Sequence, residues 1–291
     1  MYPVNPVTTY AKPYKPAVDL IQHLRARGLA VPNPASAENF IDEVGFDRLR
    51  IYFLSRRNLQ ANGRPFTAGV TFDDIVDIYT FDENLRLLMF KYCSRVEIIL
   101  KTIISEEICS MYGCDPYMDS RMYKDKDARS DMLKSISALS NKYLALDRRA
   151  KHYSDKYDDP AFPPLWMMRE FMTFGSLNYF YGKLNQGIKQ NINVKFGLGR
   201  SDILPRWISC FVDLRNVCAH HDRLFNRKFQ KIPLRSQQHN APRARDPHKV
   251  AALCHVMQVI LNNRSPNCNI EQEVRALVVN HPAVTVAEIG F

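Results

Sequence analysis

Apolar residues recur at three- and four-residue intervals along most of the chain, the spacing of helices that bury one face. The longest such stretch covers residues 72–111, with Thr71 or Asp73 expected to open it and Gly113 to end it. Because it is long for one globular helix, we expect a break near residues 81–83. Few segments alternate with a period of two. The pattern therefore predicts an all-α fold.

The same spacing predicts shorter helices on both sides of this stretch. One runs from Lys15 to a stop at Gly28, and a second uses Ser36 as its N-cap and continues to residue 53. Others are predicted at 132–146, from Trp166 onward, from Ser201-Asp202 through 215–221, at 249–262 and at 270–279. Residues 121–129 and the segment around His152 are predicted to be charged connectors.

Composition suggests a division into three parts. Residues 1–14 are predicted to form a flexible arm, because the first 13 residues hold three prolines and lack a helical period. A helical domain is expected over 15–230, followed by a basic linker and C-terminal helices over 231–291. The sequence leaves open whether these last helices pack on the main domain.

Charge favours a polyanionic partner. Forty Lys and Arg against thirty Asp and Glu give a formal net charge of +10. A cationic surface attracts nucleic acid, and an anionic membrane surface is the second candidate. The longest apolar runs fall far short of the ~20 residues of a membrane helix, so we expect no membrane-embedded part. Eight Lys and Arg face a single acid over residues 223–249, which is either a solvated loop or a phosphate-tracking segment.

The cysteines argue against a disulfide framework or a metal site. Seven cysteines, an odd number, are scattered through mostly apolar segments. Together with the absence of a recognisable export signal, this predicts reduced thiols in a cytoplasmic protein. No Cys/His pair has the spacing of a zinc site, and we expect no metal and no other cofactor.

The densest polar cluster lies at residues 213–227. At ~100° per residue, Asn216 and His220 fall one turn apart on the side opposite the predicted buried seam, and Asp213 falls there too. Arg223 joins them if the helix extends that far. Arg215 flanks the seam, so its side chain must extend outward to reach polar groups. The residues of the predicted seam are Leu204, Trp207, Ile208, Phe211, Leu214 and Cys218.

This residue set suits phosphodiester cleavage without a metal. Histidine exchanges protons near neutral pH, and arginine supplies a permanent charge for the phosphate in the transition state. RNA brings its own nucleophile, the 2′-hydroxyl. The alternative is that the Arg, Asn and His side chains form an ordinary solvated helix face.

Two other charged positions are candidates for ion pairs. Glu170 stands in an apolar helix and needs a partner, either Arg95 or Arg169. Arg86 either contacts RNA or pairs with Asp82 or Glu97.

The segment LRNVCAHHDRLFNR at 214–227 resembles the hallmark of the Abi-like abortive-infection family, within the HEPN (higher eukaryote and prokaryote nucleotide-binding) superfamily. Five other segments resemble the same family in the same order. They are GFDRLRIYF (45–53), IYTFDENLRLL (78–88), SRVEIIL (94–100), KHYSDKY (151–157) and PLWMMREFMTFGSLNYFY (164–181).

The resemblance implies a HEPN helical bundle over 15–230, with an N-terminal helical extension and a C-terminal helical tail, and a metal-independent ribonuclease activity in phage defence. Its Arg-polar-x-x-x-His motif falls on Arg215, Asn216 and His220, which become the expected catalytic residues. His221 and Arg223 are accessory candidates. The resemblance also implies a homodimer in which two motifs form a composite site, with an antitoxin as a further partner.

RNA is the expected substrate, and we expect Arg227, Lys228 and Lys231 to bind it. The alternative function is a non-catalytic RNA-binding protein of a toxin–antitoxin or defence complex, which would bind a cognate small RNA.

Overall fold

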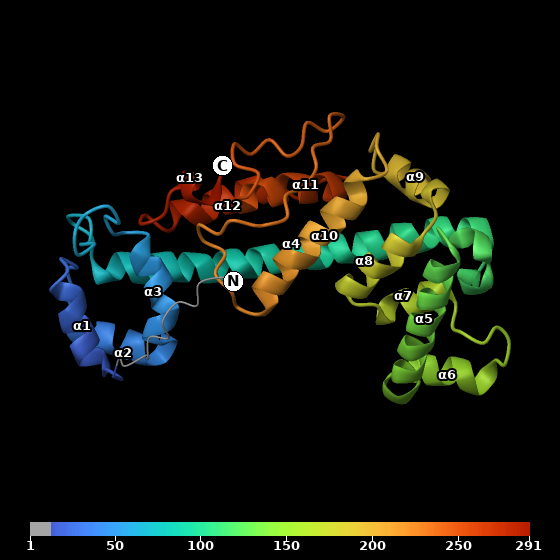
Figure 1. The fold of residues 1–291 in the computed structure, drawn as a ribbon, viewed down its shortest axis with the longest axis horizontal. Helices are drawn as coiled ribbons and strands as arrows, with labels where there is room; N and C mark the ends of the chain where they lie inside the picture. Colours follow the sequence, from blue (N-terminus) through green and yellow to red (C-terminus); the bar gives the residue numbers. More distant parts are fainter. Residues whose placement is uncertain (1–12) are drawn as a thin grey trace, which may run out of the picture. The chain divides into compact units, whose positions relative to one another are not determined.

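The computed structural model describes residues 13–291, and these form helices and no strand (Figure 1). The predicted all-α fold is confirmed. No helix in this range is both long enough and apolar enough to cross a lipid bilayer. The predicted arm lies outside the described residues except for its last two. The chain divides into two compact units, one of residues up to Thr80 with His281–Ala283, the other of Phe81–Asn280 with Val284–Phe291.

Unit 1 contains three short helices and the start of a long fourth. They are α1 (Ala17–Arg25), α2 (Pro34–Val44), α3 (Phe46–Leu54) and the first turns of α4 (Phe72–Tyr112). An aromatic cluster holds α2, α3 and α4 together: the Phe40 ring meets the Tyr79 ring edge-on at 5.6 Å, and the Tyr52 ring meets the Tyr79 ring at 5.4 Å. Edge-to-face aromatic pairs of this kind add to the free energy of area burial.

The prediction of a single helix that begins at Ser36 and continues to residue 53 is wrong in two respects. Asn33, not Ser36, is the N-cap, and its side chain accepts a hydrogen bond from the Ser36 amide at 3.1 Å. The helix then ends at Gly45, whose φ of 87° lies outside the helical region and starts α3 in a new direction. Glycine adopts this φ without steric cost, which is why the chain breaks there.

Helix α4 runs without interruption from Phe72 to Tyr112, so the predicted break near residues 81–83 is wrong. The reason is that its apolar seam continues through this stretch, with Phe81, Leu85 and Met89 fully buried. Its two ends were predicted correctly. Thr71 and Asp74 hydrogen-bond reciprocally at the start, and the Gly113 amide donates to the Cys109 carbonyl at the end.

The rest of unit 2 follows α4 in nine more α-helices among the described residues, with two short 3₁₀ turns, η1 (Pro116–Met118) and η2 (Ser120–Met122), before the first. The α-helices are α5 (Lys126–Leu146), α6 (Arg148–Lys156), α7 (Leu165–Phe171), α8 (Phe174–Lys183), α9 (Gln186–Lys195), α10 (Ile203–Ala219), α11 (Val250–Asn262), α12 (Ile270–Val279) and α13 (Val286–Ile289). Two helices begin within segments that were predicted to be connectors, and in both cases an aspartate N-cap is the cause. Asp125 starts α5 at Lys126, within the predicted charged connector, and Asp147 starts α6 where His152 was assigned to a connector.

The C-terminal helices belong to the core of unit 2. α11 is almost entirely buried and packs against α10 and α12. It also contacts α4, since the Cys254 sulfur lies 3.6 Å from the Met89 sulfur and the Cys93 sulfur lies 4.0 Å from that of Met257. The helices predicted at 249–262 and 270–279 are confirmed within a residue. The predicted domain boundaries stay predictions.

Candidate active site

Helix α10 buries the seam that its sequence predicts. Leu204, Trp207, Ile208, Phe211 and Leu214 are fully buried, and Cys218 nearly so. Burial raises the pKa of the Cys218 thiol to about 12, so this residue is an apolar packing group. Asn216 and His220 of the motif lie on the opposite side of α10, and Arg215 lies beside the seam.

Arg215 and Asn216 are both half-buried near the C-terminal end of α10. The Arg215 Nη1 donates a hydrogen bond to the Asn216 Oδ1 at 3.0 Å. The guanidinium thus finds the polar contact that its position beside the seam requires. Arg215 also lies close enough to Cys93 of α4 to oppose, in part, the burial that raises the pKa of that thiol. Arg215 thus lies near α4, and the Asn216 oxygen is already engaged.

His220 is the first residue after α10 and is exposed. Its amide donates to the Asn216 carbonyl at 2.9 Å, so the backbone keeps the helical hydrogen bond for one residue beyond the last helical position. Its imidazole consequently stays one turn beyond the Asn216 side chain, as predicted from the spacing.

The helix was expected to continue through residue 221, and it does not. His221 has φ 57°, the left-handed region, and its amide donates to the Cys218 carbonyl while the Asp222 amide donates to that of Val217. These two bonds and this φ form a Schellman cap, with a histidine in the position that glycine usually occupies. Arg223 therefore lies in the following loop and does not extend the polar face of α10.

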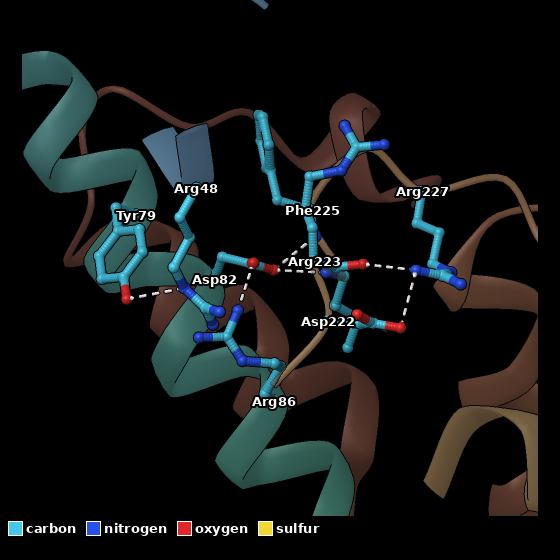
Figure 2. Close-up of polar contacts among 9 residues, drawn as sticks. Arg48, Tyr79, Asp82, Arg86, Asp222, Arg223, Phe225 and Arg227 are labelled. Carbon is cyan, nitrogen blue, oxygen red and sulfur yellow. Dashed lines mark hydrogen bonds and ion pairs between the residues drawn. The ribbon is translucent and has the colours of Figure 1, made fainter. Parts of the chain in front are cut away.

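The loop after α10 is held against α4 by Asp82 (Figure 2). One oxygen of this fully buried carboxylate accepts the amides of Leu224 and Phe225 at 2.9 and 2.5 Å. The other oxygen accepts the Arg86 Nη1 at 2.5 Å. Arg86 thus pairs with Asp82, one of the two predicted partners; the other, Glu97, pairs with Lys101 at 2.9 Å. The Phe225 ring packs edge-on against Phe81 at 6.3 Å.

The contact of Asp82 with the loop after the motif was not predicted from the sequence. A lone carboxylate on an apolar helix face, with arginine one turn later, was the available signal. Its two backbone partners, the amides of residues 224 and 225, lie more than a hundred positions away in the chain. The carboxylate fixes the start of the loop that follows the motif.

The three predicted RNA-binding residues differ in the contacts that their side chains make within the protein. The Arg227 Nη1 donates to the Arg223 carbonyl at 3.2 Å and lies 4.0 Å from the Asp222 carboxylate (Figure 2). Lys231 pairs with Asp213 at 3.0 Å, with both side chains partly exposed. Lys228 is exposed and makes no ion pair within residues 13–291. Lys228 is therefore the cation of the three that is most available to a ligand.

The remaining candidate residue has a structural contact. Glu170 pairs with Arg169 at 3.1 Å, one of the two predicted partners, and Arg169 also donates to the Ser105 hydroxyl at 2.7 Å. Residues 13–291 contain no group of three or more His, Cys, Asp or Glu side chains that could hold a metal ion.

Comparison with known proteins identifies one family. The family described as Abi-like protein matches residues 39–226, from α2 through the loop after α10. No curated protein and no solved structure matches the chain. Because the family match includes the α10 motif and extends over more than half of the sequence, the chain belongs to the Abi-like protein family.

Proposed function

We propose that the protein is a metal-independent endoribonuclease whose catalytic residues are Arg215, Asn216 and His220. Membership of the Abi-like family suggests a phage-defence role in abortive infection. The observation that carries the nuclease proposal is the exposed imidazole of His220, one turn from a half-buried Arg215–Asn216 pair on a helix end with a fixed backbone. An exposed histidine and an anchored guanidinium near the same helix end supply a proton-transfer group and a phosphate-binding group.

The reaction uses the ribose 2′-oxygen as nucleophile. His220 removes the 2′-hydroxyl proton or protonates the leaving 5′-oxygen, the 2′-oxygen bonds to phosphorus, and the bond from phosphorus to the 5′-oxygen breaks. Arg215 stabilises the negative charge that builds on the phosphate oxygens. The products carry a 2′,3′-cyclic phosphate and a 5′-hydroxyl.

We propose in addition that the active form is a homodimer. On a straight helix Arg215 and His220 point about 140° apart, so one phosphate is reached more easily by Arg215 of one subunit and His220 of the other. An antitoxin that holds the chain inactive is a further proposed partner.

The test compares the wild type with His220→Ala, using His152→Ala as a matched control. His152 is exposed on α6 and lies outside the motif. We expect the wild type and His152→Ala to arrest growth and degrade cellular RNA, and purified protein to cleave RNA in EDTA. His220→Ala should lose at least a hundredfold in rate, within the range for removing a general acid or base. Equal RNA profiles for wild type and His220→Ala would reject the mechanism.

The second candidate function is RNA binding without cleavage. It is favoured by the exposed Lys228 and by the excess of cations over residues 223–249. This function predicts tight binding that weakens steeply with salt, with intact RNA in either EDTA or Mg²⁺.

A further inference from the structure

The polar face of α10 extends well beyond the motif. Starting from the N-cap, polar residues recur every three or four positions and so share one side of the helix. These residues are Asp202, Arg206, Ser209, Asp213, Asn216 and His220. His220 ends this row, and Arg206, its second member, lies about 21 Å from His220 along the helix axis.

A cleft of about 490 Å³ lies at the far end of this row from His220. Its lining includes Lys189 from α9, Ser201, Arg206 and Ser209 from the region of α10, and Leu234 from the basic linker. The row of polar residues on α10 thus connects the candidate catalytic residues to a second concave site.

Four residues of the cleft lining carry hydrogen-bond donors: Lys189, Ser201, Arg206 and Ser209. Lys189 is only 8% exposed, and its ammonium group has a single acceptor in the described residues, the Gly182 carbonyl at 3.2 Å. The hydroxyls of Ser201 and Ser209 make no hydrogen bond within residues 13–291. The Arg206 Nε is bound to the Ile232 carbonyl at 2.8 Å, which leaves its two terminal nitrogens for other acceptors.

Among the described residues that line the cleft, Asp202 is the one carboxylate, and it is already paired. Asp202 accepts the Arg200 Nη2 at 2.5 Å, and this pair is exposed on the surface. Two cations and two hydroxyls with a paired carboxylate favour an anionic ligand. Burial of Lys189, assisted by repulsion from Lys124, lowers the pKa of its ammonium group, and a bound anion would oppose that shift.

The basic linker runs beside α10 between the cleft and the motif. The Leu234 carbonyl accepts the Trp207 indole nitrogen at 2.7 Å, and the Lys231 carbonyl accepts the Cys210 thiol at 3.7 Å. Lys231 itself pairs with Asp213, midway along the polar row, so the one acid there has a cationic partner. A polyanion lying along α10 therefore meets Lys189 and Arg206 at the cleft and Lys231 at the middle of the row.

We propose that the cleft lined by Lys189, Ser201, Arg206 and Ser209 binds a backbone phosphate of a single-stranded RNA whose scissile linkage lies at His220. This proposal rests on the proposed function, since it takes RNA as the ligand of the motif. It specifies the substrate as an extended single strand that continues several nucleotides away from the cleavage position along α10.

The experiment measures binding of labelled single-stranded RNA to His220→Ala protein, which removes the proposed catalytic imidazole. Ser209→Asp is compared with Ser209→Asn, because Asp and Asn have nearly the same volume and differ in charge. Ser130→Asp adds the same charge at an exposed site on α5. Thermal denaturation verifies that all variants are folded. A long oligonucleotide spans the motif and the cleft, whereas a dinucleotide occupies the motif alone.

For the long RNA we expect Ser209→Asp to bind at least tenfold more weakly than Ser209→Asn. The salt slope of log K should also become shallower by about 0.7, the value for one phosphate contact on a single strand. For the dinucleotide the two variants should bind equally, and Ser130→Asp should not reproduce the length-dependent loss.

Each other outcome overturns a defined part of the proposal. If the wild type cleaves RNA but Ser209→Asp and Ser209→Asn bind the long RNA equally, the cleft is not a subsite and the nuclease function remains. If the Ser209 effect is present but the wild type cleaves nothing, the subsite remains and catalysis is rejected. If none of the variants binds RNA, both proposals fail.

Discussion

Asp82 shows how one side chain positions the end of the motif. Its carboxylate is fully buried and accepts two backbone amides and one guanidinium nitrogen. A buried carboxylate with this many charge-assisted bonds is costly to disturb, because loss of its charge leaves Arg86 buried without a counter-ion.

We therefore predict that Asp82→Asn lowers the free energy of unfolding by about 3 kcal/mol, the lower end of the range for a broken buried ion pair. Asp202→Asn is the matched control, because the Asp202–Arg200 pair is exposed and should contribute about 1 kcal/mol or less. Urea denaturation measures both. A loss for Asp82→Asn no larger than that for Asp202→Asn would mean that the pair does not stabilise the fold.

His255 is predicted to make stability depend on pH. Burial is the larger influence and lowers the pKa of this imidazole below its ordinary 6.5, against the opposing effect of Glu271 at 3.6 Å. The unfolded chain then binds more protons than the folded chain below pH 6.5, so the free energy of unfolding falls as the pH falls through this range.

The check is the loss of stability between pH 7.5 and pH 5 in the wild type and in His255→Gln. The variant should lose less, with His23 contributing a smaller remainder because burial lowers its pKa as well. Keeping the pH at or above 5 limits the contribution of carboxylates such as Glu271, whose pKa is also lowered. An identical decrease in both proteins would contradict the prediction.

At the scale of single elements, capping residues decide where helices end. Gly45 separates α2 from α3 with φ 87°, and His221 ends α10 with φ 57°. The end at Gly45 does not follow from apolar spacing, which continues across it, and the end at His221 depends on a histidine in the left-handed region. This is why the sequence predicted one helix where α2 and α3 stand, and a longer α10.

Two glycine substitutions separate backbone strain from helix propensity. Gly45→Ala should lower stability by about 1 kcal/mol, because an L-residue is strained at positive φ although no atom lies within 4 Å of the added Cβ. Gly182→Ala should raise stability by up to about 1 kcal/mol, because Gly182 lies within α8 and its added Cβ also meets no atom within 4 Å. Thermal denaturation of both variants gives the sign of each change in stability. Shifts of the same sign would contradict this assignment.

At the scale of the whole molecule, the proposed composite site predicts complementation between two inactive subunits. Arg215→Ala retains His220, and His220→Ala retains Arg215, so a mixed dimer contains one complete Arg–His pair and one empty one. With random pairing, half the dimers are mixed, and co-expression should restore about a quarter of the wild-type sites.

The measurement is RNA cleavage by the co-expressed pair, compared with each variant purified alone. Recovery of activity only in the mixture supports a site shared between subunits. If each site lies within one subunit, the mixture should be as inactive as its components. That result would reject the composite site but not the catalytic residues, which the His220→Ala comparison tests separately.

The periodicity of apolar and polar residues was sufficient to predict much of the helical structure of this protein. The all-α class, the buried seam of α10 and the placement of Asn216 and His220 one turn apart all follow from side chains repeating every 3.6 residues, a property that neighbouring residues alone express. Tertiary structure decided the rest: the docking of residues 224 and 225 on Asp82, the course of the basic linker along α10, and the cleft that brings Lys189 beside Arg206. These contacts join residues far apart in the chain, and no spacing rule connects such residues, because which partners meet depends on how whole helices pack.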